Sequence, residues 1–212
     1  MLVHGANAER MHQRHVKAPP GSTPLNLMLM GVSNTGKTEA IRRHYGSDVY
    51  EFPYNCTGNQ WVWTGLDPER HRVLLFDEFE GQVPAGILSR WLQKGPIQCR
   101  MPGANIIWWQ PEVIAFCCHD FPQDWGHAWT KQTRHDVESI ARRLHYVAPY
   151  VRSYLPNRDK QDYWDRWLWN AIELSVDRSR LDEMQGDNDP QELVDSWTEQ
   201  RLDVNLLPAP PL

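Results

Sequence analysis

The chain has 212 residues, of which 41% are hydrophobic and 23% are charged, so it is long and apolar enough to form a domain with a buried core. No apolar run approaches the roughly 20 residues that cross a bilayer, which predicts an intracellular protein with no membrane partner. Its four cysteines show neither a disulfide framework nor a C-x-x-C spacing, which is typical of a reducing compartment.

Charge is unevenly distributed along the chain, whose net charge is −5. From Asp177 to the last residue, nine acidic residues face three basic ones, so this segment carries −6 and residues 1–176 carry about +1. A nucleic-acid partner would therefore need a local basic patch, because the field of the whole chain does not attract it. Eleven tryptophans are many for this length. Core packing is their simplest interpretation, and base stacking by one or two is the alternative.

The first part of the chain combines a polar arm with a strand and a helix. Residues 1–24 are polar and end in a Pro- and Gly-rich segment, which predicts a flexible arm. The apolar run "LNLMLM" (25–30) predicts a buried strand. After the segment "GVSNTGKT" (31–38), residues 39–45 predict a helix, and Gly46 ends it.

The middle of the chain predicts two further strands, a helix and a hairpin. "HRVLLFDEFEG" (71–81) indicates a strand that ends in acidic residues, and "ILSRWLQKG" (87–95) indicates an amphipathic helix. "PIQCRMPGANIIWW" (96–109) favours a hairpin that turns at Pro102 and Gly103. "VIAFCCHD" (113–120) is typical of a third buried strand.

The last part of the chain predicts helices and then a tail. Residues 136–147 and 159–174 have helical patterns, the second within a C-terminal helical segment at 151–180. Residues 181–212 are acidic and end in "PAPPL", so we expect them to be weakly ordered. Buried strands that alternate with helices predict an α/β domain with a parallel sheet.

The segment 31–38 fits the phosphate-loop pattern G-x-x-x-x-G-K-T/S. Its glycines let backbone N–H groups surround phosphates, and the following helix N-terminus adds positive potential. Lys37 is expected to reach the β- and γ-phosphates, and the Thr38 hydroxyl is expected to hold Mg²⁺. The motif therefore predicts binding of ATP with Mg²⁺. The predicted nucleotide-binding residues are Gly31, Val32, Ser33, Asn34, Thr35, Gly36, Lys37 and Thr38.

Two acidic residues end the second predicted strand, about forty residues after Lys37. Asp77 would join Thr38 at the Mg²⁺, and Glu78 would orient and deprotonate the attacking water. Acidic residues at the end of a strand are common. When they follow a phosphate-loop motif by this spacing, they independently indicate the same nucleotide-binding site. The presence of Glu78 favours hydrolysis of ATP by water, because a small-molecule kinase would not need such a base.

The run "FCCHD" (116–120) poses a choice between a metal site, a reactive thiol and a buried strand that presents one polar residue. Adjacent strand residues point to opposite faces, so Cys117 and Cys118 cannot hold one ion together. No basic partner that would activate a thiol is nearby in sequence. A buried strand that brings His119 to the γ-phosphate is therefore favoured, and an ordinarily packed histidine is the alternative.

These segments, in this order and spacing, resemble a superfamily 3 helicase. The closest resemblance is to the helicase half of the replication-associated protein (Rep) of circular single-stranded DNA viruses such as circoviruses, over residues 25–150. "QWVWTG" (60–65) resembles the family's Trp-rich segment, and Pro122 and Trp125 resemble its Pro-x-x-Trp. The resemblance implies an AAA+-like P-loop NTPase sheet, a homo-oligomeric ring that is usually a hexamer, and ATP-driven movement along single-stranded DNA.

The resemblance also carries roles for individual residues. The family's third strand ends in an Asn that senses the γ-phosphate, and the matching residue is His119. Arg142 and Arg143 resemble a segment in which an arginine finger serves the ATP of the neighbouring subunit. The family's hairpin grips the DNA backbone with a Lys, and the matching residue is Pro102. Either Arg100 replaces that Lys as the nucleic-acid contact, or the ring translocates poorly.

The sequence has no His-hydrophobic-His strand and no Tyr-x-x-Lys helix, so nicking chemistry is not encoded in it. Either a separate nuclease subunit carries that chemistry, or the chain is a truncated product. The resulting hypothesis is an ATP hydrolase of the superfamily 3 helicase type that acts in genome replication. Its rivals are an RNA helicase of a positive-strand RNA virus, which would bind RNA, and a nucleotide-dependent assembly or binding module with a defective pore. A DNA virus would place the protein in the host nucleus, and an RNA virus in the cytoplasm.

Overall fold

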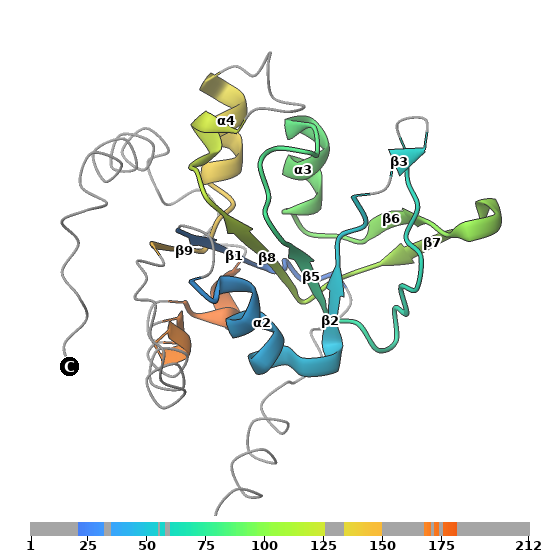
Figure 1. Ribbon diagram of the computed structural model, residues 1–212, viewed down its shortest axis with the longest axis horizontal. Helices are drawn as coiled ribbons and strands as arrows, with labels where there is room; N and C mark the ends of the chain where they lie inside the picture. Colours follow the sequence, from blue (N-terminus) through green and yellow to red (C-terminus); the bar gives the residue numbers. More distant parts are fainter. Residues whose placement is uncertain are drawn as a thin grey trace, which may run out of the picture.

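Five strands that all run in the same direction form the central sheet (Figure 1). The computed structural model describes residues 21–31, 35–54, 56–57, 60–125, 134–149, 168–170, 172–173 and 176–181. Across the sheet the strand order is β2-β5-β8-β1-β9. The strands are β1 (Leu25–Met30), β2 (Val49–Glu51), β5 (Val73–Phe76), β8 (Val113–Cys118) and β9 (Tyr146–Pro149).

Helices cover both faces of this sheet, because each parallel pair needs a connection that crosses over the sheet. Helix α2 (Lys37–Tyr45) follows β1 and lies on one face, whereas α3 (Ala85–Trp91) and α4 (Arg134–Ala141) lie on the other (Figure 1). The predicted α/β fold, with a parallel sheet flanked by helices, is confirmed. Among the described residues, none of the helices has the length and apolar character needed to cross a bilayer.

Two small antiparallel strand pairs lie in the connections between the strands of the central sheet. Two-residue strands β3 (Cys56–Thr57) and β4 (Gln60–Trp61) pair with each other, and β6 (Ile97–Arg100) pairs with β7 (Ile106–Trp109) in an antiparallel hairpin that extends away from the sheet (Figure 1). The hairpin was predicted, including its turn at Pro102–Ala104. The other short turns of 3₁₀ type are Gly46–Asp48, Pro122–Asp124 and Arg178–Arg180.

Successive residues of the buried strands divide between two hydrophobic clusters, one on each face of the sheet. Met28, Phe116 and Cys118 pack on the side of α3 and α4. Leu27 and Cys117 pack on the side of α2. The described part of the C-terminal segment, including Leu168, Trp169 and Ile172, joins the cluster on the α2 side. Because both faces are covered, β5 and β8 are apolar throughout instead of alternating, and β1 is apolar except for Asn26.

The helix predicted over residues 136–147 is wrong at its C-terminal end. Helix α4 stops at Ala141, Arg142 and Arg143 lie in the turn after it, and residues 146–149 form β9 beside β1. Strand β9 pairs with the open edge of β1, a tertiary interaction that helical periodicity does not register. Helix α3 also ends at Trp91, earlier than the predicted Gly95. Residues 1–20, most of the predicted helix 159–174 and residues 182–212 lie outside the described residues.

A buried polar residue in β1 connects the sheet to the ends of two helices. The side-chain amide of Asn26 donates to the carbonyl oxygens of Leu92 (2.8 Å) and Arg143 (2.7 Å), which lie just after α3 and α4. The Asn26 backbone N–H donates to Nδ1 of His145 at 2.9 Å. Asn26 is fully buried, so these bonds replace water that its side-chain NH₂ group and the helix carbonyls have lost.

We expect Asn26→Ala to destabilise the fold by about 2–3 kcal/mol, because two helix-end carbonyls would lose their donor in a site that water does not reach. Urea denaturation followed by circular dichroism measures this change. Gln98→Ala removes an amide from an exposed position of β6 and serves as the control, with an expected change within about 0.5 kcal/mol. An unchanged denaturation midpoint for Asn26→Ala would contradict the connecting role.

Candidate nucleotide-binding site

The carboxyl ends of three neighbouring strands define the site. Strand β8 lies between β1 and β5, with Cys118 level with Met30 and Phe116 level with Phe76. The carbonyl oxygens that end β8 accept one bond on each side. Gly31 N–H donates to Cys118 (3.1 Å), and Phe79 N–H donates to Cys117 (2.9 Å). The loop after β1 and the acidic turn after β5 are thus attached to the same strand.

Lys37 is the first residue of α2 and lies inside the phosphate loop. Gly36 precedes it with φ 89°, a left-handed conformation that glycine adopts without strain. The Lys37 ammonium is buried and donates to the Gly31 carbonyl at 2.7 Å. Burial lowers the pKa of Lys37, and the charges of Asp77 and Glu78 oppose this effect. Thr35 is also buried here, and the motif residues Val32, Ser33 and Asn34 lie outside the described residues.

Thr38 and Asp77, the two residues expected to share Mg²⁺, are in contact, with the Thr38 hydroxyl donating to Oδ1 of Asp77. Carboxylate and hydroxyl oxygens are hard ligands of the kind Mg²⁺ prefers, so this pair fits the ion. Glu78, the next residue, is exposed and has φ 49°, which is uncommon for a residue other than glycine. The turn therefore directs two adjacent carboxylates into different surroundings.

Sequence reasoning missed two residues that hold Asp77. The Tyr54 hydroxyl donates to the Asp77 backbone carbonyl at 2.5 Å, and Nη2 of Arg42 lies 3.9 Å from Oδ2 of Asp77. Burial, and then the charge of Asp77, raise the pKa of Tyr54, so its hydroxyl keeps the proton that it donates. Arg42 also binds Glu51, with Nε to Oε1 at 2.8 Å. Arg42 follows Thr38 by one helical turn, a spacing that could have indicated it, whereas nothing in the sequence indicates Tyr54.

The two cysteines at the end of β8 belong to opposite faces of the sheet, as predicted. Burial raises the pKa of the Cys117 thiol to about 12 and also raises the pKa of Cys118, so both stay protonated at neutral pH. Within the described ranges there is no group of three or more residues suited to hold a metal ion. His119 follows directly at the end of the strand and is half-buried. It thus ends the strand beside the phosphate loop.

The structure does not bring the two arginines to the phosphate loop of the same chain. The Arg143 carbonyl binds Asn26, near the amino end of β1, whereas Gly31 lies at its carboxyl end. Five residues of strand separate these points, or about 16 Å. Arg143 bends back onto its own helix, with Nη1 donating to Oγ of Ser139 at 2.8 Å. Arg142 is exposed, so only Arg142 presents a guanidinium to an approaching molecule.

Arg100 lies at the end of β6 and is exposed, with its carbonyl accepting a bond from Trp63 N–H at 2.9 Å. The turn beyond it contains Pro102 and Gly103, the latter with φ 79°. The hairpin extends away from the sheet, so the structure places Arg100 apart from the phosphate loop (Figure 1). It is a separate candidate contact and not a member of the nucleotide site.

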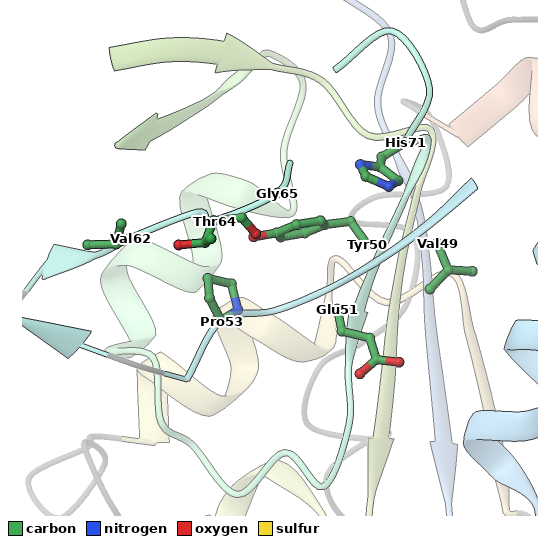
Figure 2. Close-up of a pocket in the computed structure, with 8 residues that line it drawn as sticks. All are labelled: Val49, Tyr50, Glu51, Pro53, Val62, Thr64, Gly65 and His71. Atoms are coloured by element: carbon green, nitrogen blue, oxygen red, sulfur yellow. The ribbon is translucent and has the colours of Figure 1, made fainter. Parts of the chain in front are cut away.

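A pocket of about 510 Å³ lies on the outer side of β2, and Figure 2 shows Tyr50, Thr64 and His71 in its lining. The Tyr50 hydroxyl donates to the Thr64 carbonyl at 3.1 Å. None of the described phosphate-loop residues (31 and 35–38) lines this pocket. The lining residue Glu51 binds Arg42, which in turn lies near Asp77 of the nucleotide site.

Neither a protein-family profile nor a curated protein sequence matches this chain. Solved structures with distant similarity to this chain include the NrS-1 C-terminal region and Hsp104. The A form apo structure of the NrS-1 C-terminal region has a TM-score of 0.41 at 11% identity, covering 81% of this chain and 42% of that one. The S. cerevisiae Hsp104–ADP complex has a TM-score of 0.43 at 13% identity, covering 94% of this chain and 36% of that one. This chain thus spans less than half of the length of either structure, and similarities this distant assign no function.

We expect Tyr54→Phe to raise the Mg²⁺ concentration needed for half-maximal nucleotide hydrolysis by about 3- to 10-fold, because the turn that carries Asp77 loses one hydrogen bond. Titrating Mg²⁺ at saturating ATP measures the effect. Tyr50→Phe deletes an equivalent hydroxyl in the pocket on β2 and should leave the Mg²⁺ dependence unchanged. The same shift in both variants, or in neither, would remove Tyr54 from the site.

Proposed function

We propose that this chain is an ATP-hydrolysing domain of the superfamily 3 helicase type, which moves on single-stranded nucleic acid during replication of a viral genome. The observation that carries the proposal is the contact between Thr38, in the first turn of α2 after β1, and Asp77, which directly follows β5 on the other side of β8. This contact brings together two oxygen groups of the kind that Mg²⁺ prefers, next to the buried Lys37, and Glu78 follows Asp77 in the same turn. A phosphate loop used only as a structural turn would not need this combination.

In this proposal the chain's own groups bind and orient ATP. N–H groups of the phosphate loop and the start of α2 hold the phosphates, and Lys37 exchanges its bond to the Gly31 carbonyl for a bond to the β- and γ-phosphates. Bound Mg²⁺ would neutralise charge on the phosphate oxygens, held by Thr38 and Asp77. Glu78 accepts the proton of the attacking water.

His119 and Arg142 complete the proposed site from two directions. His119 ends the strand between β1 and β5, where its ring can hydrogen-bond the γ-phosphate or the attacking water. Arg142 lies in the turn near the amino end of β1, whereas the phosphate loop lies at its carboxyl end, so we assign Arg142 to the ATP of a neighbouring subunit. A homo-oligomeric ring, with the hexamer as its expected form, supplies that geometry.

Single-stranded DNA is the proposed substrate, with Arg100 as the basic contact on the hairpin. An RNA helicase of a positive-strand RNA virus is the second candidate, and it would act on RNA in the cytoplasm instead of DNA in the nucleus. Pro102 at the hairpin turn favours a third candidate function, a nucleotide-dependent assembly or binding module, because proline supplies no charge to bind a strand in the pore. A separate nuclease subunit would supply nicking chemistry in the first case.

We expect ATP hydrolysis by the full chain that single-stranded DNA stimulates more than RNA does. Lys37→Ala should abolish turnover, because it removes the cation that bridges the phosphates. Glu78→Gln should still bind ATP but turn it over about 10²-fold more slowly, as expected for loss of a positioned base. Phosphate-release assays with each polymer, and equilibrium binding of ATP, measure these effects. Normal turnover by Glu78→Gln would exclude the base, and stimulation by neither polymer would favour the module.

We expect Arg142→Ala to lower ATP turnover by about 10³-fold. Mixing this variant with Lys37→Ala protein should restore part of the turnover, because in a mixed ring the intact Arg142 of one subunit would serve the intact phosphate loop of its neighbour. Arg143→Ala is the matched control. It removes an adjacent guanidinium that is bound to Ser139, so its main effect should be on stability. Turnover across a range of mixing ratios measures the rescue. No rescue at any ratio, in rings shown to mix, would contradict action between subunits.

A further inference from the structure

The hairpin of β6 and β7 presents one face to the protein and the other to solvent. Its inner face contains Cys99 and Trp109, which are buried in the core. On the outer face, Gln98 lies opposite Trp108, and Arg100 lies opposite Ile106. All four outer side chains are exposed, so they form one continuous surface that we call the hairpin face.

Trp108 and Ile106 stand out among the apolar residues. Trp108 is 63% exposed and Ile106 is 56% exposed, whereas the other described tryptophans are buried or half-buried. Exposing two large apolar side chains on a projecting hairpin contributes no packing to the fold. A surface of this kind indicates a binding partner.

Charge in the surrounding sequence indicates which partner fits. Residues 91–111 contain Lys94 and Arg100 and no acidic residue, in a chain with a net charge of −5. Arg100 lies diagonally across the hairpin from Trp108, roughly 7–8 Å away, a separation that a single nucleotide can span. An aromatic plane beside a cation matches an unpaired base with its phosphate.

We propose that Trp108 is a base-stacking platform for single-stranded nucleic acid, with Arg100 holding the adjacent phosphate. This inference rests on the proposed function and adds the group that selects single strands. In a duplex the base faces are already stacked on one another, so only an unpaired base offers a face to Trp108. Because every base has such a face, the hairpin face selects strand state and not sequence.

The test compares oligothymidine with an abasic strand of the same length, both carrying a fluorescent label, in binding to the full chain. Trp108→Ala should weaken binding of oligothymidine by about 5- to 100-fold, whereas Trp108→Phe, which keeps an aromatic plane, should stay within about 3-fold of the unmodified chain. Both variants should bind the abasic strand as the unmodified chain does. Arg100→Ala should weaken binding of both strands and lower the salt slope by about one unit, with Lys94→Ala as its charge-matched control.

Several outcomes would overturn the inference. Unchanged binding by Trp108→Ala, where the unmodified chain binds, would reject the stacking platform and leave the proposed function standing. An equal loss on both strands would show that Trp108 does not read bases. Loss of oligomer size by Trp108→Ala without any strand, seen by light scattering, would make the hairpin face an interface between copies. No binding of either strand by the unmodified chain would reject the proposed function as well.

Discussion

The candidate site depends on strand β8 lying between β1 and β5. The loop after β1 and the acidic turn after β5 come from segments about forty residues apart. A backbone N–H of each segment donates a hydrogen bond to a carbonyl oxygen of β8. Cys118 holds Gly31 and Cys117 holds Phe79, so the distance between Thr38 and Asp77 is fixed by the spacing of adjacent strands. If β5 paired directly with β1, the same two residues would face each other without a strand between them to present His119.

This position explains why a strand with so little polar character ends in two cysteines. Residues at the middle of a covered parallel sheet are buried on both faces. Cysteine is readily buried and only weakly polar, which suits this position. The raised pKa of each thiol follows from this burial and gives neither residue a reactive role.

The chain also separates its chemistry between two ends of the sheet. Asn26 binds the turn that carries Arg142 and Arg143 near the amino end of β1, while the phosphate loop lies at its carboxyl end. A strand cannot shorten, so no side-chain motion within one chain joins the two. If Arg142 or Arg143 acts on ATP, it therefore does so on the ATP of another subunit.

The sequence by itself determined the features that depend on local chemistry. Strands β1, β5 and β8, the start of α2 and the hairpin turn all follow from apolar runs and glycine positions. Thr38 and Asp77 follow from the residue types that phosphate and Mg²⁺ require. Only the tertiary structure decided the edge strands β2 and β9, since a short strand gains its stability from the neighbour with which it pairs. The tertiary structure likewise decided that Tyr54 contacts Asp77 and that Arg143 folds back onto Ser139. It also decided that Trp108 is the most exposed of the described tryptophans. Contacts of this kind do not produce a periodic pattern in the sequence, so the sequence could not predict them.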